Sequence, residues 1–363
     1  MKLIVNKTLS DKSTYGGGVG GYYRALRKYN NDFNYLDATY SIKNNNILRF
    51  IWEYFRAQVR LYKLQKKASV IIYNPSLAGY SWFRDLIQMR ILSRGQVKRV
   101  VFFRGWNDKL SNKISTSLIY KKIFNYIYNN KVDAYIVLSS TFKKHLVSWG
   151  VKKPIFVETT IVDENLLNEF STEKKSGDKS KFELLFLSRV EKAKGALEAV
   201  QAVHLLTERS NSIYFNIAGN GSAITELEQY IFSNELSNIR LIGYVKGEQK
   251  VEAFKQANIF IFPSNHGEGM PNSLLEAMAF GLPVLTTRVG GIPDFFEEGK
   301  MGLFLDNRDP EHIAKKIQFL LDRPELMKEM SRYNYEYAKD HFYASKVAAR
   351  LKNIIDDVTE GRV

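Results

Sequence analysis

The sequence has no cysteine, and it has no apolar run of the length that spans a lipid bilayer. Without cysteine the chain can form neither disulfides nor thiolate metal sites, which fits a reducing compartment. A transmembrane helix needs about 20 mainly apolar residues in succession. The apolar run near the N-terminus, LIV at 3–5, is also too short for a signal peptide. We therefore expect a cytoplasmic protein.

Metal-binding patterns are missing as well. The five histidines are scattered without a His-x-x-x-His pair, and no Asp-x-Asp triplet occurs. Since metal sites need several such side chains at defined spacings, we expect no bound metal and no cofactor. The chain also lacks a Walker loop, a nucleophile elbow and the interleaved aromatics of a nucleic-acid groove. A nucleic-acid partner is therefore not expected.

Acidic residues are scarce in one half of the chain. Residues 1–165 hold 28 lysines and arginines against 10 aspartates and glutamates, a net charge of +18. The remaining residues hold 25 against 28, a net charge of −3. This asymmetry indicates an anionic partner for the first half, such as a membrane surface or a phosphorylated acceptor. The alternative is that the extra lysines only aid solubility.

Two segments of the basic half, 46–67 and 109–130, have amphipathic patterns of helical period. The favoured interpretation is an ordinary surface helix packed on its sheet, and the alternative is a helix that lies on anionic lipid. In the first segment a basic stripe faces an apolar one: Arg49, Arg56, Arg60, Lys63 and Lys67 against Ile47, Ile51, Tyr54, Phe55, Leu61 and Tyr62.

The length of 363 residues suggests two domains. We expect an N-terminal domain at 1–166, a polar linker at 167–183 and a C-terminal domain at 184–363, whose last helix could cross back to the first domain. Short apolar runs alternate with helical patterns in both, which predicts an α/β protein with two Rossmann-like parallel sheets. Ligands of such sheets gather at the carboxyl ends of the strands, here in a cleft between the domains.

The expected strands are 3–6, 69–74, 99–105, 134–140, 184–189, 214–219, 239–243, 259–263, 284–287 and 302–306. The expected helices are 20–30, 47–67, 109–129, 141–149, 195–209, 222–233, 248–257 and a helical tail from 309.

The segment Glu268–Leu285 combines an anion-binding feature with two carboxylates. Pro271 stands near the expected first position of a helix, where its missing N–H costs nothing. A helix start leaves N–H groups unpaired and carries a partial positive charge, so it suits a diphosphate. Glu268 and Glu276 would repel phosphate but would suit sugar hydroxyls. The segment therefore indicates a sugar attached to a phosphate.

Two cations follow the expected strand at 184–189. Arg189 and Lys194 are five residues apart, just before a helix. We interpret them as a clamp for a diphosphate leaving group, to which arginine gives forked hydrogen bonds and lysine a point charge. The alternative is a solvated basic loop.

A glycine-rich segment near the N-terminus is another candidate for phosphate binding. Gly16–Gly21 satisfies G-x-G-x-x-G, and Asp37 follows at a distance typical of a ribose-binding acid. Against a dinucleotide site, the loop Lys7–Thr14 separates these glycines from the preceding strand, whereas the fingerprint follows its strand directly. A plain turn is the remaining alternative.

These motifs occur together in the order typical of retaining glycosyltransferases of family four, which have the GT-B fold. The sequence resembles this family over essentially its whole length, most clearly in the second half. The resemblance rests on the Glu268–Glu276 pair (E-x7-E), on Arg189 with Lys194, and on GGVG at 17–20, AGNG at 218–221, IGY at 242–244 and VGGIPD at 289–294.

The resemblance implies a nucleotide-diphosphate sugar donor, UDP- or GDP-linked, held mostly by the second domain. It assigns catalysis to Glu268, which would hold the transferred sugar, and to Arg189 and Lys194, which would neutralise the leaving diphosphate. Glu276 would bind the ribose. The donor-binding set that it implies is Gly17, Gly18, Val19, Gly219, Gly243, Tyr244, Gly269, Met270, Asn272, Ser273 and Glu276.

The family also implies a glycan or lipid-linked acceptor, held by the first domain. Many members carry His-Gly after the strand that here ends near 103, where this chain has Arg104-Gly-Trp106. We expect Arg104 and Trp106 near the acceptor, with Arg104 gripping a phosphate or a carboxylated sugar.

The expected function is retaining, metal-independent glycosyl transfer in the synthesis of a cell-surface polysaccharide or lipopolysaccharide, in the cytoplasm or at the inner face of the membrane. One alternative is a sugar-nucleotide epimerase or hydrolase of the same fold. A catalytically silent binding protein and an NAD(P) oxidoreductase are the others.

Overall fold

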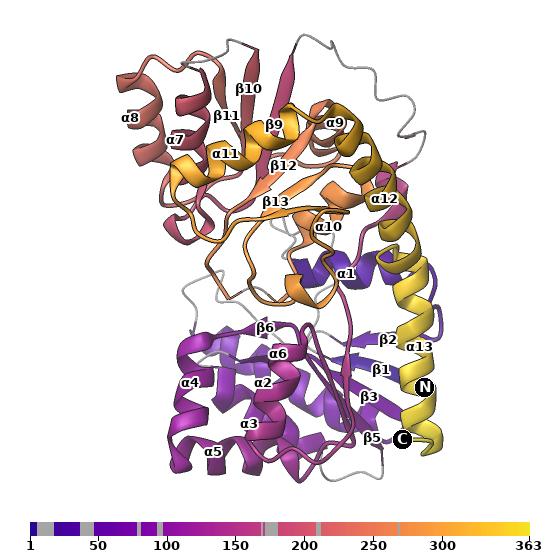
Figure 1. Ribbon diagram of the computed structural model, residues 1–363. Coiled ribbons are helices and arrows are strands. Elements are labelled where there is room, and N and C mark those ends of the chain that lie inside the picture. The colour runs from indigo at the N-terminus through magenta and orange to yellow at the C-terminus, as the bar shows by residue number, and fades with distance from the viewer. Residues whose placement is uncertain are drawn as a thin grey trace. The chain divides into compact units, whose positions relative to one another are not determined.

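The structure, a computed structural model, describes residues 1–5, 18–36, 47–77, 81–92, 97–167, 170, 181–207, 212–267 and 269–363. The chain forms two compact units (Figure 1). Unit 1 comprises Met1–Thr160 and Ala344–Val363, and unit 2 comprises Ile161–Tyr343. Most of the linker expected at 167–183 lies outside the described residues.

Unit 1 is built on a parallel sheet of six described strands, in the order β2-β1-β3-β5-β7-β8. Val, Ile, Phe and Tyr dominate these strands, and those of the four central strands are buried, as expected where helices cover both faces of a parallel sheet. The strands are β1 (Lys2–Val5), β2 (Phe33–Leu36), β3 (Val70–Tyr73), β5 (Lys98–Phe103), β7 (Ala134–Val137) and β8 (Ile155–Val157). Two short segments beyond the sheet, β4 (Ser76–Leu77) and β6 (Gly105–Trp106), pair with each other.

The helices of unit 1 include one from the far end of the sequence. Helix α13 packs against α1 and β5 and runs beside the strands in Figure 1. Arg350 on α13 forms a two-pronged ion pair with Glu158, with N–O distances of 2.7 and 3.2 Å. The helices are α1 (Gly18–Leu26), α2 (Ile47–Gln65), α3 (Ser81–Leu92), α4 (Asp108–Thr116), α5 (Leu118–Phe124), η1 (Asn125–Asn129), α6 (Ser140–Ser148) and α13 (Ala344–Glu360).

The helix expected at 109–129 is broken in the structure. Ser117 has an extended backbone between α4 and α5, and the last turn, η1, is a π-helix. The side chain of Asn107 caps α4 by accepting a hydrogen bond from the Leu110 N–H, at 2.9 Å. The apolar period continues across the break, which is why the pattern suggested one helix. Elements β2, β8 and α3 were not expected from the sequence.

Unit 2 also has a parallel sheet of six described strands, in the order β11-β10-β9-β12-β13-β14. They are β9 (Phe182–Leu187), β10 (Ile213–Ala218), β11 (Ile239–Gly243), β12 (Ile259–Phe262), β13 (Val284–Thr286) and β14 (Gly302–Phe304). The chain adds β10 and β11 on one side of β9 and then adds β12, β13 and β14 on the other. The strand order therefore reverses between β9 and β12.

Helices cover both faces of this sheet. Helix α7 packs against α8 and α11, whereas α10 packs against α12 (Figure 1). The helical elements are η2 (Glu164–Leu167), η4 (Lys192–Lys194), α7 (Ala196–Thr207), α8 (Ile224–Ser233), α9 (Glu248–Gln256), α10 (Asn272–Ala279), η5 (Ile292–Asp294), α11 (Pro310–Leu321) and α12 (Pro324–His341). No helix in the described part of the chain combines the length and apolar content needed to cross a bilayer.

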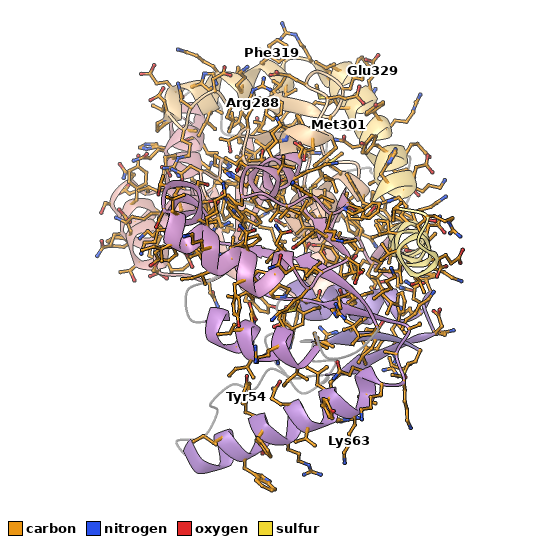
Figure 2. The ribbon with its side chains drawn as sticks, turned by 90° about the horizontal axis from the view of Figure 1, so that it is seen from below. Tyr54, Lys63, Arg288, Met301, Phe319 and Glu329 are labelled. Carbon is orange, nitrogen blue, oxygen red and sulfur yellow. The ribbon has the colours of Figure 1, made fainter. Side chains whose placement is uncertain are left out.

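Helix α2 differs from the surface helix that the sequence favoured. Part of the apolar stripe packs inward, since Leu61 is buried and Tyr54 half-buried. In Figure 2, Tyr54 lies on the side of α2 toward the rest of the unit and Lys63 lies on the outer side. The rest of the stripe does not pack on the unit: Trp52 is 64% exposed and Phe55 61%. The side chains of Ile47 and Arg49 lie outside the described set.

Candidate functional site

The site predicted for the donor lies at the carboxyl edge of the unit 2 sheet, where the strand order reverses. Arg189 and Lys194 follow β9, and helix α10 follows β12, the strand hydrogen-bonded to β9. Loops that leave neighbouring strands at such a switch point diverge to opposite faces of the sheet and open a crevice for ligand. The topology alone therefore brings these two sequence motifs together.

The loop after β9 is held against the loop after β12. The Asn265 N–H donates to the carbonyl of Ala193 at 2.9 Å. Gly195 has φ of +78°, and a Cβ there would come within 2.4 Å of the Pro263 carbonyl oxygen. Only glycine allows this conformation and this approach without strain. The contact fixes Lys194, the residue before this glycine, beside the end of β12.

Lys194 is the buried cation of the site. Only 4% of its surface is exposed, and its Nζ lies 5.9 Å from the centre of the Phe262 ring. Burial and, to a smaller extent, the Arg189 charge lower the pKa of Lys194 to about 8, with Glu191 partly offsetting both. A cation that costs free energy to bury is stabilised when an anion binds. Its place at the carboxyl edge suits a phosphate ligand.

Arg189 has a different environment. Its side chain is 64% exposed, and its Nη1 lies 3.1 Å from Oε1 of Glu191. An exposed pair of this kind contributes little to stability and opens easily. Arg189 is therefore an exposed cation, whereas Lys194 is a buried one.

The N-cap residue of helix α10 gives its N–H groups no side-chain cap. Pro271 is the N-cap residue, and it makes no side-chain hydrogen bond to the helix. The Oδ1 atom of Asn272 is buried and has no hydrogen-bond partner among the described residues. The preceding segment is fixed, because the Gly291 N–H donates to the Gly269 carbonyl at 2.8 Å. An uncapped helix start is a site for an anion.

Glu276 points from the second turn of α10 to a residue that the sequence did not single out. Its Oε1 accepts a hydrogen bond from Nζ of Lys250 on α9, at 2.7 Å. Both side chains are largely buried, with 13% and 21% of their surface exposed. Lys250 lies within an expected helix, but nothing in its sequence neighbourhood shows which carboxylate it meets.

Gly219, one of the glycines predicted to approach the donor, is required by a close backbone contact. A Cβ on Gly219 would lie 1.8 Å from the Ser188 carbonyl oxygen, and its φ is +142°. Its N–H donates to the carbonyl of Gly243 at 2.7 Å, which joins the ends of β10 and β11. Tyr244 follows and is half exposed. The β9, β10 and β11 loops therefore meet at one edge.

Several predicted residues are only partly described. Glu268 and Gly17 lie outside the described residues. Gly18 and Val19 form the first turn of α1 in unit 1, and Met270 is buried just before α10. Ser273 is the second residue of α10 and is half-buried.

In unit 1, Arg104 and Trp106 stand at the end of β5. The Trp106 ring stacks on Phe142 with ring centres 4.1 Å apart and on Trp149 at 5.5 Å. Trp106 thus belongs to an aromatic stack against the core and is half-buried. Arg104 lies over the Tyr22 ring, 3.5 Å from its centre to Cζ.

The surroundings of the site hold neither a metal-binding cluster among the described residues nor the groove beside β11. Within the described residues, no three histidine, aspartate or glutamate side chains gather as metal ligands would. A groove of about 600 Å³ lies beside the edge strand β11, lined among others by Glu183, Arg240 and Glu248. Neither Lys194 nor the start of α10 lines it. The groove is therefore separate from the switch-point site.

Fold and site together define a Rossmann-type protein with an anion site at a strand-order switch. A family model described as glycosyl transferases group 1 matches residues 168–337, which include the described site residues of unit 2. Over these residues the chain is similar to the family that the resemblance predicted.

Individual relatives match over part of their length. The capsular polysaccharide biosynthesis glycosyltransferase CapM of Staphylococcus aureus is 26% identical over 217 residues, 58% of this chain and 55% of that protein. The D-inositol 3-phosphate glycosyltransferase of Corynebacterium efficiens is 30% identical over 181 residues, 48% of this chain and 42% of that protein. The matched segments span about half the length of the curated relatives.

Solved structures match over nearly the whole chain. HepE from Anabaena in complex with UDP gives a TM-score of 0.77 at 13% identity, covering 98% of this chain and all of that chain. Sucrose-phosphate synthase from Thermosynechococcus elongatus gives 0.74 at 15% identity, covering 99% and 100%. Such low identity shows the fold alone, and the predicted GT-B fold is confirmed.

Proposed function

We propose that the protein is a retaining glycosyltransferase that moves a glycosyl group from a nucleoside-diphosphate sugar to a glycan or lipid-linked acceptor. The observation that carries the proposal is Lys194, a buried cation fixed beside an uncapped helix start at the switch point of unit 2. HepE from Anabaena is known in complex with UDP, and CapM is named for capsular polysaccharide biosynthesis. Both support a nucleotide-sugar donor and a role in surface polysaccharide synthesis.

The proposed chemistry breaks the bond between the anomeric carbon and the phosphate oxygen of the donor. The acceptor hydroxyl oxygen forms the new bond on the same face, and its proton passes to the departing phosphate. Negative charge grows on the diphosphate, and in this proposal Lys194, Arg189 and the α10 N–H groups stabilise it. We propose that these groups supply the positive charge without a metal, and that Glu276 binds the ribose.

The basic unit 1 is proposed to hold the acceptor and to rest on an anionic membrane. On α2, at about 100° per residue, the exposed apolar side chains form one sector and the exposed basic ones the next. Apolar side chains beside a basic flank are typical of helices that lie in the headgroup region. The apolar sector is Ile51, Trp52, Phe55, Val59 and Tyr62, and the basic one is Arg56, Arg60 and Lys63.

The catalytic proposal is tested first by ligand-induced thermal stabilisation. UDP, GDP and their sugar derivatives are screened at millimolar concentration, and each hit is assayed for donor hydrolysis and transfer. We expect one nucleoside diphosphate to raise the melting temperature of the wild type and to do so less in Lys194→Met. Lys192→Met is the matched control, because Lys192 lies in the same loop, is 81% exposed and pairs with Glu226.

Two readouts decide the finer points. NMR of the first product gives the anomeric configuration, and inversion would contradict the retaining mechanism. Activity that is lost with EDTA and restored by a divalent cation would contradict metal independence. If no nucleotide stabilises the protein, the proposal as a whole is contradicted. The alternative of a catalytically silent protein that binds nucleotides at Lys194 is contradicted by the same result.

A further inference from the structure

The carboxyl edge of the unit 1 sheet has its own strand-order switch. The chain places β2 on one side of β1 and β3 on the other, so the order reverses between β1 and β3. Strand β5 pairs with β3, and Arg104 follows its last residue. The backbone of Arg104 is held on both sides, because β5 precedes it and the β4–β6 pair follows it. This residue is thus fixed at the edge where such sheets bind ligands.

The Arg104 guanidinium rests on aromatic rings rather than on a carboxylate. Its Cζ lies 3.5 Å from the centre of the Tyr22 ring and 5.0 Å from that of Phe102. Tyr22 and Phe102 meet edge to face. The neighbouring Tyr23 is locked in turn, since its hydroxyl donates to Oδ1 of Asn74 at 2.7 Å. These packed aromatic rings therefore hold the guanidinium in place.

The charge of Arg104 lacks a counterion among the described residues. Its Nε and Nη1 atoms are buried without a hydrogen-bond partner, although the side chain as a whole keeps part of its surface open. Burial lowers the pKa of Arg104 from its ordinary value, and Tyr22 and Tyr23 partly offset this effect. Arginine nevertheless stays charged at neutral pH. A poorly compensated cation in such a place favours an anion.

Other arginines of unit 1 show what a purely structural role looks like. Arg84 donates to Oδ1 of the buried Asp85 at 2.7 and 2.9 Å. Arg350 pairs with Glu158, and Arg99 donates to two backbone carbonyls at 3.0 Å. Each of these guanidinium groups is occupied by protein oxygens. Arg104 differs from all three.

We propose that Arg104 binds an oxyanion, a phosphate or a carboxylate, carried by the acceptor substrate. The inference rests on the proposed function and specifies its acceptor as anionic. The donor diphosphate has its own cations and helix start in unit 2, so a second fixed cation in the acceptor-holding unit calls for a second anion. Phosphate and carboxylate share the planar fork chemistry by which arginine recognises both.

The test separates this site from the donor site. In a Lys194→Met background, which weakens the donor site, we expect inorganic phosphate to raise the melting temperature, and Arg104→Met to remove that rise. Arg104→Met alone should still be stabilised by UDP like the wild type. Arg99→Met is the matched control, because it removes the same charge from the same strand but from an occupied guanidinium. Should Arg104→Met fail to fold, Arg104→Lys keeps the charge and should keep part of the phosphate effect.

Binding of charged sugars shows whether the anion is carried by a sugar acceptor or is free in solution. Glucose 6-phosphate and glucuronate should bind the UDP complex at least about tenfold more tightly than glucose, a difference of about 1.4 kcal/mol, and Arg104→Met should abolish the preference. Stabilisation by inorganic phosphate without a preference for the charged sugars would assign the site to a free anion and overturn the acceptor proposal. A phosphate effect that survives Arg104→Met, or no binding of any charged probe at millimolar concentration, would overturn the site itself. Failure of UDP to stabilise the wild type would instead count against the proposed function.

Discussion

The two units use the same architectural plan and differ in where their chemistry lies. Unit 2 concentrates it in short loops at the sheet edge, where glycines let the β9 and β12 loops touch and Lys194 is buried between them. Unit 1 carries much of its distinctive chemistry on a helix surface, with Trp52 and Phe55 exposed beside a basic flank. The difference teaches that a parallel sheet fixes where a site can form, whereas loops and helix faces decide what it binds.

The buried cation of unit 2 should give the largest effect. Lys194→Met is expected to lower kcat/KM about 100-fold, roughly 2.7 kcal/mol, because the leaving diphosphate loses a cation in a poorly solvated place. Lys192→Met should stay within about twofold of the wild type, because Lys192 is solvated. Steady-state kinetics with the donor found by the screen measures both. Equal losses of kcat/KM in the two variants would contradict the prediction that the buried Lys194 contributes more than the solvated Lys192.

The exposed face of unit 1 should give the next effect. Trp52→Glu combined with Phe55→Glu is expected to weaken binding to anionic vesicles about 30-fold, because two large apolar contacts are lost and two negative charges are added. Flotation with phosphatidylglycerol-rich vesicles at low and high salt measures it. Phe232→Glu is the control, since Phe232 on α8 of unit 2 is 86% exposed yet has no proposed lipid contact. Equal flotation of all variants, or equal binding to neutral vesicles, would contradict the membrane proposal.

The Lys250–Glu276 pair should affect donor binding more than turnover. Glu276→Gln and Lys250→Met are each expected to raise the donor KM about tenfold with kcat within about threefold, because the pair positions a ribose contact away from the reacting bond. The double variant should lose little more than either single one, as expected of two groups that act together. Additive losses would show that Lys250 does not act through Glu276.

The pH dependence of nucleotide binding should be the smallest effect. Lys194 has a pKa of about 8, so its protonated fraction falls from about nine-tenths at pH 7 to about one-tenth at pH 9. The protonated form binds the diphosphate, and affinity for UDP should therefore fall several-fold as the pH rises through 8. Titration calorimetry of wild type and Lys194→Met measures this change, and a flat wild-type profile would refute the assignment.

Much of unit 2 followed from the sequence because its signals are local. Apolar runs of strand length, followed by helical periods, marked β9 to β13 closely. The order of the motifs along the chain then brought Arg189, Lys194 and the α10 start to one edge, since carboxyl ends of parallel strands share an edge. Helix α10 also followed from local signals, with a proline at its start and Gly281 after its end.

Other features could not be predicted from the sequence, because they depend on what packs against each segment. The period at 109–129 was continuous, yet Ser117 breaks the helix. The apolar stripe of α2 was expected to pack on its sheet, but only the part that includes Tyr54 and Leu61 does so. Periodicity shows that a face is apolar and does not show whether the fold covers it.

By itself the sequence determined the α/β class, the resemblance to a glycosyltransferase family, the charge asymmetry and the residue types gathered at the candidate donor edge. Tertiary structure decided that Lys194 is buried while Arg189 is exposed, that Glu276 meets Lys250, and that Arg104 lies on aromatic rings with no carboxylate partner among the described residues. The physical reason is the distance along the chain over which each effect acts. Propensity and period act over a few residues, whereas burial and charge pairing depend on segments that meet only after the sheets have formed.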